Sequence, residues 1–209
     1  MGDLSIQQCD PAADIPARIL ASLKLPVERW PTPVLMSLLG LPATGKTALA
    51  RSLAERHPLV VLSTDAIRLK YGLSSGLATH AVTYPVIGEL LDQKIGVVWD
   101  GVHFKKDDRR RVRQFADEHG ARFVLVVTTT NPAVIAQRLQ EREHSPEQTV
   151  AQGKFVITPE HFARIARWLE PAEPNEEPWI IDTSRGEDPD QVAPLGQYLE
   201  TLRNPSGIQ

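Results

Sequence analysis

The sequence predicts an α/β fold in three layers, with helices on both faces of a five-stranded, mostly parallel sheet and a helical lid at one end. The first observation is a set of five short apolar runs, each typical of a strand buried on both faces. The second is that helix-like stretches separate these runs, because alternating strands and helices predict βαβ units and a parallel sheet. The third is a glycine-rich turn directly after the first run, where such sheets bind ligands.

The apolar runs and the signals between them place each element. Asn131 and Thr158, each followed by a proline, are typical of helix N-termini. The acidic, proline-rich stretch Glu170–Pro178 is expected to be a surface connection. Strands are expected at Val34–Leu39, Leu59–Leu62, Gly96–Asp100, Arg122–Thr128 and Trp179–Asp182. Helices are expected at 46–57, 64–71, 79–95, 105–119, 131–143, from 158 onward and at 190–202.

Residues 1–33 are expected to form a helical extension ahead of the main domain, which spans residues 34–209. Asp14 can cap a short helix that has Pro16 in its first turn. The apolar stripe of this helix would consist of Ile15, Ile19, Leu20 and Leu23.

Composition narrows the class of protein. The chain has 23 Lys plus Arg against 26 Asp plus Glu, a net charge of −3, which argues against a general nucleic-acid coat. Hydrophobic residues make up 42%, enough for a core, and no apolar run approaches the length that spans a bilayer. The single cysteine, Cys9, forms no internal disulfide, and the first residues lack a signal-peptide pattern. These features favour a cytoplasmic protein that does not associate with membranes.

The strongest motif is Gly40-Leu41-Pro42-Ala43-Thr44-Gly45-Lys46-Thr47, which matches G-x-x-x-x-G-K-[ST] between a predicted strand and a predicted helix. Its glycines let backbone N–H groups wrap around phosphates, and the helix N-terminus adds a partial positive charge. Lys46 would reach the β- and γ-phosphates of ATP, and Thr47 would offer a hydroxyl to Mg²⁺. The motif therefore predicts a P-loop NTPase fold.

Two aspartates end the neighbouring strands. Asp65 follows the second strand and Asp100 ends the third. One carboxylate can accept the proton of an attacking hydroxyl, and the other can orient Mg²⁺ or its waters. The structural alternatives are a helix N-cap for Asp65 and a turn before Gly101 for Asp100.

The residue after Asp100 helps to distinguish a protein that transfers a phosphoryl group from one that hydrolyses a nucleotide. A motor ATPase would usually carry Asp-Glu here, and a GTPase switch would carry Asp-x-x-Gly and Asn-Lys-x-Asp. The pair Asp100-Gly101 lacks a water-activating carboxylate, which favours phosphoryl transfer to a bound acceptor.

Further basic residues are candidates for the cleft. Arg138 and Arg142 are four apart on a predicted helix and could stabilise the transferred phosphoryl group, or could face solvent beside Glu141 and Glu143. Arg68 could bind an acidic group on the acceptor. The net charge averages the acidic stretch 170–178 against basic groups at 68, 105–113, 138 and 142, so it is compatible with a local positive cleft.

Over residues 34–202 the chain resembles the P-loop kinases of the AAA-domain, polynucleotide-kinase-like group, with gluconate kinases, chloramphenicol phosphotransferases and zeta toxins as more distant relatives. The residues that carry the resemblance are Gly40–Thr47, Ser63–Arg68, Val98–Gly101, Arg138-x-x-x-Arg142 and Ile181–Thr183.

The resemblance implies ATP and Mg²⁺ as ligands, Asp65 as the base and Asp100 near the metal. It also implies a lid at about 138–158 that carries the two arginines, an acid-binding role for Arg68, and contact of Asp182 and Thr183 with adenine. The sequence departs from polynucleotide kinases at Val102, where these often carry Asn.

The predicted function is transfer of the ATP γ-phosphoryl group to a hydroxyl of a small molecule or of a nucleic-acid 5′-end. The alternative is an NTP-binding regulatory or hydrolytic P-loop protein without an acceptor.

Overall fold

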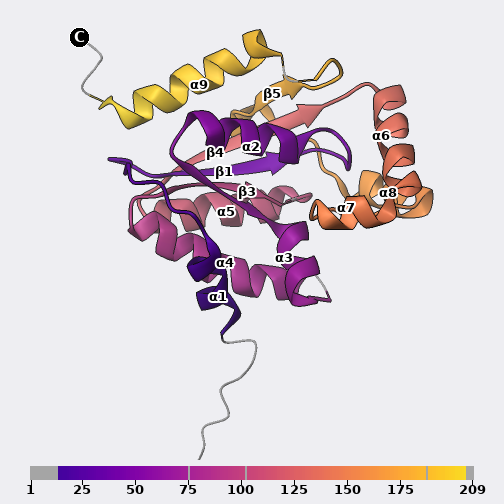
Figure 1. The fold of residues 1–209 in the computed structure, drawn as a ribbon. Coiled ribbons are helices and arrows are strands. Elements are labelled where there is room, and N and C mark those ends of the chain that lie inside the picture. Colours follow the sequence, from indigo (N-terminus) through magenta and orange to yellow (C-terminus); the bar gives the residue numbers. More distant parts are fainter. Residues whose placement is uncertain (1–13, 75, 102, 187, 206–209) are drawn as a thin grey trace, which may run out of the picture.

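The computed structural model describes residues 14–74, 76–101, 103–186 and 188–205, and its centre is one five-stranded sheet (Figure 1). The strands are β1 (Val34–Leu39), β2 (Leu59–Ser63), β3 (Gly96–Asp100), β4 (Arg122–Thr129) and β5 (Trp179–Asp182). Their order is β2-β3-β1-β4-β5, and all four pairings are parallel. The sheet is thus wholly parallel, and its carboxyl ends meet at one edge.

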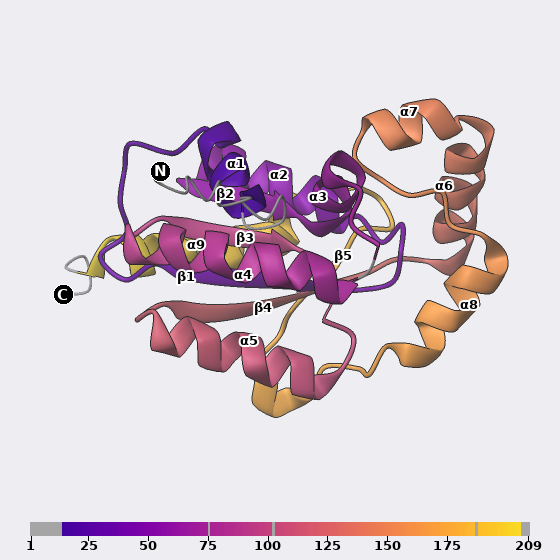
Figure 2. The ribbon, with the colours of Figure 1, turned by 90° about the horizontal axis from the view of Figure 1, so that it is seen from below.

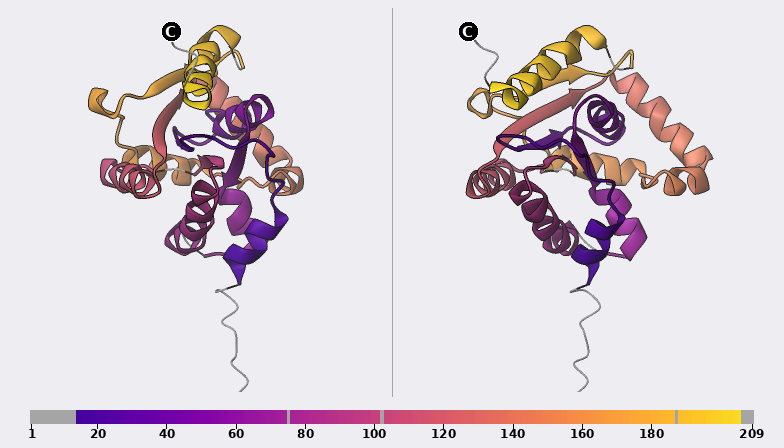
Figure 3. Two further views of the ribbon diagram at one scale, coloured as in Figure 1. Left: turned by 90° about the vertical axis from the view of Figure 1, so that its left-hand side faces the viewer. Right: turned by 60° about the vertical axis from the view of Figure 1, so that its left-hand side comes forward.

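Helices cover both faces of the sheet, as Figures 1 and 3 show. One face carries α1 (Ile15–Ser22), α3 (Thr64–Tyr71), α4 (Gly76–Asp92) and α5 (Lys106–Glu118), whose apolar side chains form one core cluster with the strands. The other face carries α2 (Lys46–Arg56) and α9 (Pro189–Arg203), which build a second cluster. The three-layer prediction is confirmed.

Three helices project beyond the carboxyl end of the sheet as a lid: α6 (Pro132–His144), α7 (Pro146–Ala151) and α8 (Pro159–Trp168). They stand together on the right-hand side of Figure 2, and a short 3-10 turn, Pro174–Glu176, lies on the return path to β5. The lid is longer than expected from the sequence. Helix α7 was not expected at all, because six residues are too few to show a helical period.

The segment before β1 packs onto the sheet. Ile15 and Ile19 are buried, and Leu20 and Leu23 pack against the same cluster, as the apolar stripe predicted. The predicted Asp14 cap is wrong: this residue has helical dihedral angles and makes no capping hydrogen bond. Cys9 and the rest of residues 1–13 lie outside the described residues.

The indole of Trp30 is buried at the amino end of the sheet. Its Nε1 donates a hydrogen bond to the carbonyl oxygen of Pro58 at 2.9 Å, and its backbone N–H donates to the carbonyl of Lys94. Residues 14–33 therefore share the core of the domain.

The basic run of α5 and the acidic segment after α8 pair with each other. Arg109 is fully buried and makes a two-bond ion pair with Glu176, at 2.7 and 2.9 Å. It also donates to the backbone carbonyls of His103, Phe104, Glu170 and Pro171. Lys105 pairs with Glu170 and Lys106 with Glu173. These three cations are therefore neutralised where the lid rejoins the domain.

None of the described helices combines the length and the apolar character that crossing a membrane requires.

Candidate active site

The turn after β1 forms a phosphate-binding loop whose groups point inward. Gly45 precedes α2 with φ of 88°, and an added Cβ there would lie 3.0 Å from the Thr183 hydroxyl, so both conformation and space require glycine. The ammonium of Lys46 donates to the carbonyl oxygens of Gly40 and Leu41, both at 2.8 Å. The lysine thus lies across the loop in the place that phosphates would take.

A cavity of about 880 Å³ opens over this loop and extends under the lid. Most of the residues predicted from the sequence line it, although they come from five separate segments. They are Pro42, Ala43, Gly45, Lys46, Thr47, Asp65, Arg68, Asp100, Arg138, Arg142 and Thr183.

Gly40, Leu41 and Thr44 shape the loop from behind instead of lining the cavity. The Thr44 hydroxyl donates to the carbonyl of Leu41 at 2.8 Å and hydrogen-bonds to the Thr128 hydroxyl at 2.7 Å. The Thr183 hydroxyl donates to the carbonyl of Thr44 at 2.8 Å. This threonine network was not predicted; the signal was the Thr128-Thr129-Thr130 run at the end of β4.

Asp182 and Thr183 differ in their position relative to the cavity. The Asp182 carboxylate is exposed and accepts hydrogen bonds from the backbone N–H and hydroxyl of Ser184, at 2.8 and 2.6 Å. These bonds hold the pKa of Asp182 below its ordinary value. Asp182 is absent from the cavity wall, which includes Thr183 and Gly186. Asp182 therefore shapes the loop that brings Thr183 to the cavity.

The two predicted carboxylates face the same space. Asp100 is buried at the end of β3, in register with Ser63 at the end of β2. Asp65 lies in the first turn of α3, and the N-cap of that helix is Ser63, whose hydroxyl accepts from the N–H of Ala66 at 3.4 Å. The capping alternative for Asp65 is therefore wrong, and its carboxylate is left for the cavity.

The electrostatics of the cavity couple these groups. The walls around Asp65 remove much of its bulk water and, with the negative charge of Asp100 second, raise the pKa of its carboxyl. Its side chain still contacts solvent through the cavity. Burial lowers the pKa of Lys46 to about 8, although Asp100 and Asp65 oppose this shift. An acid with a raised pKa and a base with a lowered pKa in one cleft are typical of a functional site.

The lid arginines point toward the cavity and not toward their helical neighbours. Arg138 donates to the carbonyl oxygens of Ala43 at 3.0 Å and Thr183 at 2.9 Å, joining α6 to the phosphate loop. Burial lowers the pKa of Arg142, which Asp65 opposes. Within the described part of the chain, neither arginine makes an ion pair with Glu141 or Glu143. The solvent-facing alternative is not what the structure shows.

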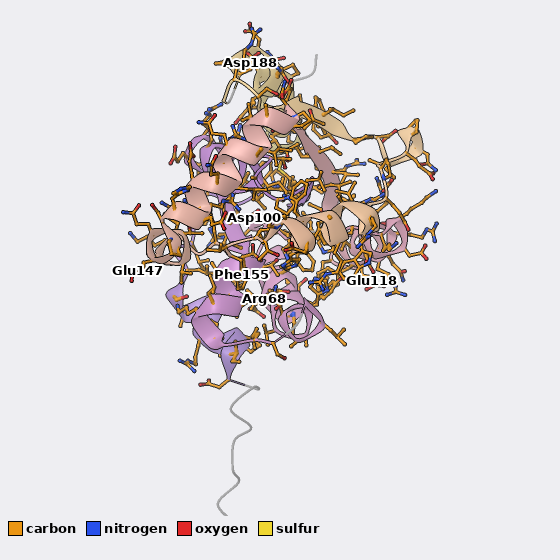
Figure 4. All side chains as sticks on the ribbon, turned by 90° about the vertical axis from the view of Figure 1, so that its right-hand side faces the viewer. Arg68, Asp100, Glu118, Glu147, Phe155 and Asp188 are labelled. Carbon is orange, nitrogen blue, oxygen red and sulfur yellow. The ribbon has the colours of Figure 1, made fainter. Side chains whose placement is uncertain are left out.

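Arg68 and Phe155 meet where the lid touches α3. The guanidinium carbon of Arg68 lies 4.8 Å from the centroid of the Phe155 ring, and Figure 4 labels both in the same region of the view as Asp100. The Nε of Arg68 is buried without a hydrogen-bond partner. Sequence reasoning missed Phe155, because nothing in residues 143–158 marked it.

His103 is buried and makes structural contacts. Its Nδ1 shares a hydrogen bond with the Ser37 hydroxyl at 2.9 Å, and its ring packs on Trp99 and His80. Burial, and then His80, lower the pKa of His103 to about 3, so it is neutral. Val102 lies outside the described residues.

The oxygen donors at the loop fit a magnesium ion that arrives with phosphates. Thr47 and Asp100 both line the cavity and offer a hydroxyl and a carboxylate. The described residues contain no cluster of three or more acidic, His or Cys side chains that could form a complete metal cage. Mg²⁺ is commonly bound by one or two carboxylates together with substrate phosphates, so this sparse set suits it.

The fold and this site define a P-loop nucleotide-binding protein with a kinase-like fold. The chain belongs to the AAA domain family, whose model matches residues 35–171. The predicted AAA-domain membership is thus confirmed. No functionally curated protein matches the sequence.

Solved structures share the fold at low identity. Chaetomium thermophilum Kti12 in complex with ADP-AlF3 is 15% identical with a TM-score of 0.64, over 81% of this chain and 98% of that one. A gluconokinase from Sinorhizobium meliloti is 19% identical with a TM-score of 0.57, over 84% and 97%. A chain of the Pnkp1/Rnl/Hen1 RNA repair complex is 17% identical with a TM-score of 0.53, over 72% of this chain and 46% of that chain.

Proposed function

We propose that this protein is an ATP-dependent kinase that transfers the γ-phosphoryl group to a hydroxyl of a small molecule or of a nucleic-acid 5′-end. The observation that carries the proposal is the position of Asp65. It shares one cavity with the phosphate loop, lies close enough to Lys46 for their charges to interact, and is not the N-cap of its helix. The gluconokinase of the same fold supports this assignment.

The reaction would proceed by attack of the acceptor oxygen on the γ-phosphorus. The carboxylate of Asp65 accepts the hydroxyl proton, an oxygen–phosphorus bond forms, and the bond from the γ-phosphorus to the bridging oxygen breaks, releasing ADP. Lys46, Arg138 and Arg142 place positive charge around the group in transit. Thr47 and Asp100 would hold Mg²⁺, which neutralises phosphate charge when bound.

The nucleotide end of the cavity would hold the rest of ATP. Thr183 is the side chain that we expect beside the adenine, with Asp182 fixing its loop through Ser184. We expect the cytoplasm to be the site of the reaction, since the chain has one cysteine and ATP is abundant there.

The test replaces the proposed base with its uncharged isostere. Asp65→Asn is expected to lower kcat for acceptor-dependent ATP consumption by roughly 10²–10⁴-fold, the range for loss of a general base. Its ATP affinity should change by only a few-fold. Asp190→Asn is the matched control, because Asp190 is also an exposed first-turn aspartate but lies on α9 outside the cavity wall.

Two results would count against the proposal. Unchanged turnover in Asp65→Asn would remove Asp65 as the base. An acceptor screen with labelled ATP in which no hydroxyl compound raises consumption above the background would favour the regulatory or hydrolytic alternative. Lys46→Ala should abolish both activities, and so confirms that either signal comes from this site.

A further inference from the structure

Six apolar side chains line the cavity to which Asp65 and Asp100 also contribute. We call the part of the cavity beside them the acceptor compartment and define its apolar wall by Phe104, Phe155, Val156, Ile157, Ile165 and Trp168. They come from the segment after β3, the segment after α7, and α8. The backbone of Phe104 accepts a hydrogen bond from the N–H of Glu170 at 2.9 Å, which holds the first of these segments against the end of α8.

Trp168 is exposed although it is one of the largest apolar side chains. Its side chain keeps 48% of its surface accessible, whereas Trp30 and Trp99 are fully buried in the core. Trp168 lines the cavity, with the guanidinium of Arg164 over its ring at 5.5 Å. Water-exposed aromatic surface inside a concave site is stabilised by burial against a flat apolar ligand.

The same wall is poorly suited to a polyol. The six wall residues offer one polar side-chain atom, the indole Nε1 of Trp168, although polar side chains such as Arg68, His80, Lys154 and His161 also line the cavity. A sugar or sugar acid has a hydroxyl on almost every carbon, and each one left unpaired against an apolar wall costs binding free energy. A ligand with one reacting hydroxyl and an apolar body would lose no such bonds.

Charge argues against a long nucleic acid. Binding along a phosphodiester backbone requires several free cations outside the catalytic centre. The most basic segment near this end, residues 105–113, is instead paired with acidic side chains: Lys105 with Glu170, Lys106 with Glu173 and Arg109 with Glu176. This leaves no continuous basic track along α5.

We infer that the phosphoryl acceptor is a small alcohol with an aromatic or similarly flat apolar body, packed against Trp168 with its hydroxyl toward Asp65. This inference rests on the proposed kinase function for the role of the ligand. The ligand class itself follows from the wall and is tested by binding alone.

The experiment compares two alcohols that differ in one apolar group: 3-phenyl-1-propanol and 1-propanol. Calorimetry on the full-length protein is expected to show that the phenyl compound binds at least roughly tenfold tighter, the scale of an apolar pocket contact. Trp168→Ala should remove most of this preference. Val150→Ala should keep it, because Val150 is an exposed lid residue outside the cavity wall. Thermal unfolding checks that both variants are folded.

The outcomes separate the inference from the function on which it rests. Equal binding of the two alcohols, tighter binding of 1-propanol, no binding of either, or a preference that survives Trp168→Ala would each overturn the inference. So would tighter binding of a 5′-hydroxyl oligonucleotide than of the phenyl compound. Preference for the phenyl compound without any labelled phosphoryl transfer would support the ligand class and refute the kinase. Labelled phosphoryl transfer to 1-propanol without a phenyl preference would support the kinase and refute the ligand class.

Discussion

Gly153 is the point where the lid meets α3, and replacing it tests whether lid position controls activity. It follows α7 with φ of 73°, and its N–H donates to the carbonyl of Val150. An added Cβ would lie 2.9 Å from the Cβ of Ala66 and 3.4 Å from its Cα. Carbon atoms prefer separations of roughly 3.5–4.0 Å, so Gly153→Ala must move the lid outward by several tenths of an ångström or more.

Gly153→Ala strains the left-handed backbone at this position and also displaces the lid. A matched control variant separates the two effects. Gly120→Ala has the same left-handed conformation, with φ of 60°, but nothing lies within 4 Å of the added Cβ. Each variant should lose about 1–2 kcal/mol of local conformational energy. Only Gly153→Ala displaces the Arg138–Phe155 part of the lid. Because a shift near 1 Å can cost on the order of 10²-fold, we expect its kcat/KM to fall by roughly 10–100-fold.

The assay combines acceptor-dependent ATP consumption with unfolding in denaturant. Gly120→Ala should show the stability loss with kcat/KM within about twofold of the wild type. Equal kcat/KM values for Gly153→Ala and Gly120→Ala would refute the idea that contact between the lid and Ala66 sets the catalytic geometry.

Three further predictions concern titration and charge. The acid limb of kcat/KM should lie at higher pH than an ordinary carboxyl gives, since the base must be ionised and burial raises the pKa of Asp65; a pH profile tests this. The pKa of His103 is about 3 in the folded protein, whereas its ordinary value is 6.5. Between these two pH values the imidazole binds a proton in the unfolded chain but not in the folded one, so the free energy of unfolding decreases as the pH falls. At about pH 5 this decrease is about 2 kcal/mol. Unfolding at about pH 7 and pH 5 should show this loss in the wild type but not in His103→Gln. Arg109→Ala should lower the free energy of unfolding by about 3–5 kcal/mol, because it leaves the partly buried Glu176 without its ion-pair partner. Arg110→Ala removes one partner of an exposed ion pair and should cost under about 1 kcal/mol in the same unfolding assay.

The strands were predictable because burial on both faces makes each one a continuous apolar run. The predicted and observed bounds of β1 are identical, and those of β2 and β4 differ by one residue. What the sequence did not reveal concerns the local backbone conformation of one residue and the distant partners of others. Asp14 has the residue type of a cap, but its backbone enters the helix, so its carboxylate makes no capping bond. The basic run 105–113 gave no sign that its partners would be glutamates 65 to 67 residues later.

The phosphate-binding loop could be predicted from the sequence, whereas the acceptor compartment could not. Phosphate is bound by backbone N–H groups and one lysine, whose positions depend on local spacing, so eight consecutive residues predict that end. The acceptor compartment is assembled from three segments that share no spacing rule, and its apolar residues are of the same types that build a core. In the sequence, nothing distinguishes Phe104 and Trp168 from other hydrophobic residues beside helices, although both line the cavity in the structure. If the two ends are independent in binding as well, Trp168→Ala should alter acceptor affinity and leave ATP affinity unchanged, and its effect should add to that of a substitution in the phosphate loop.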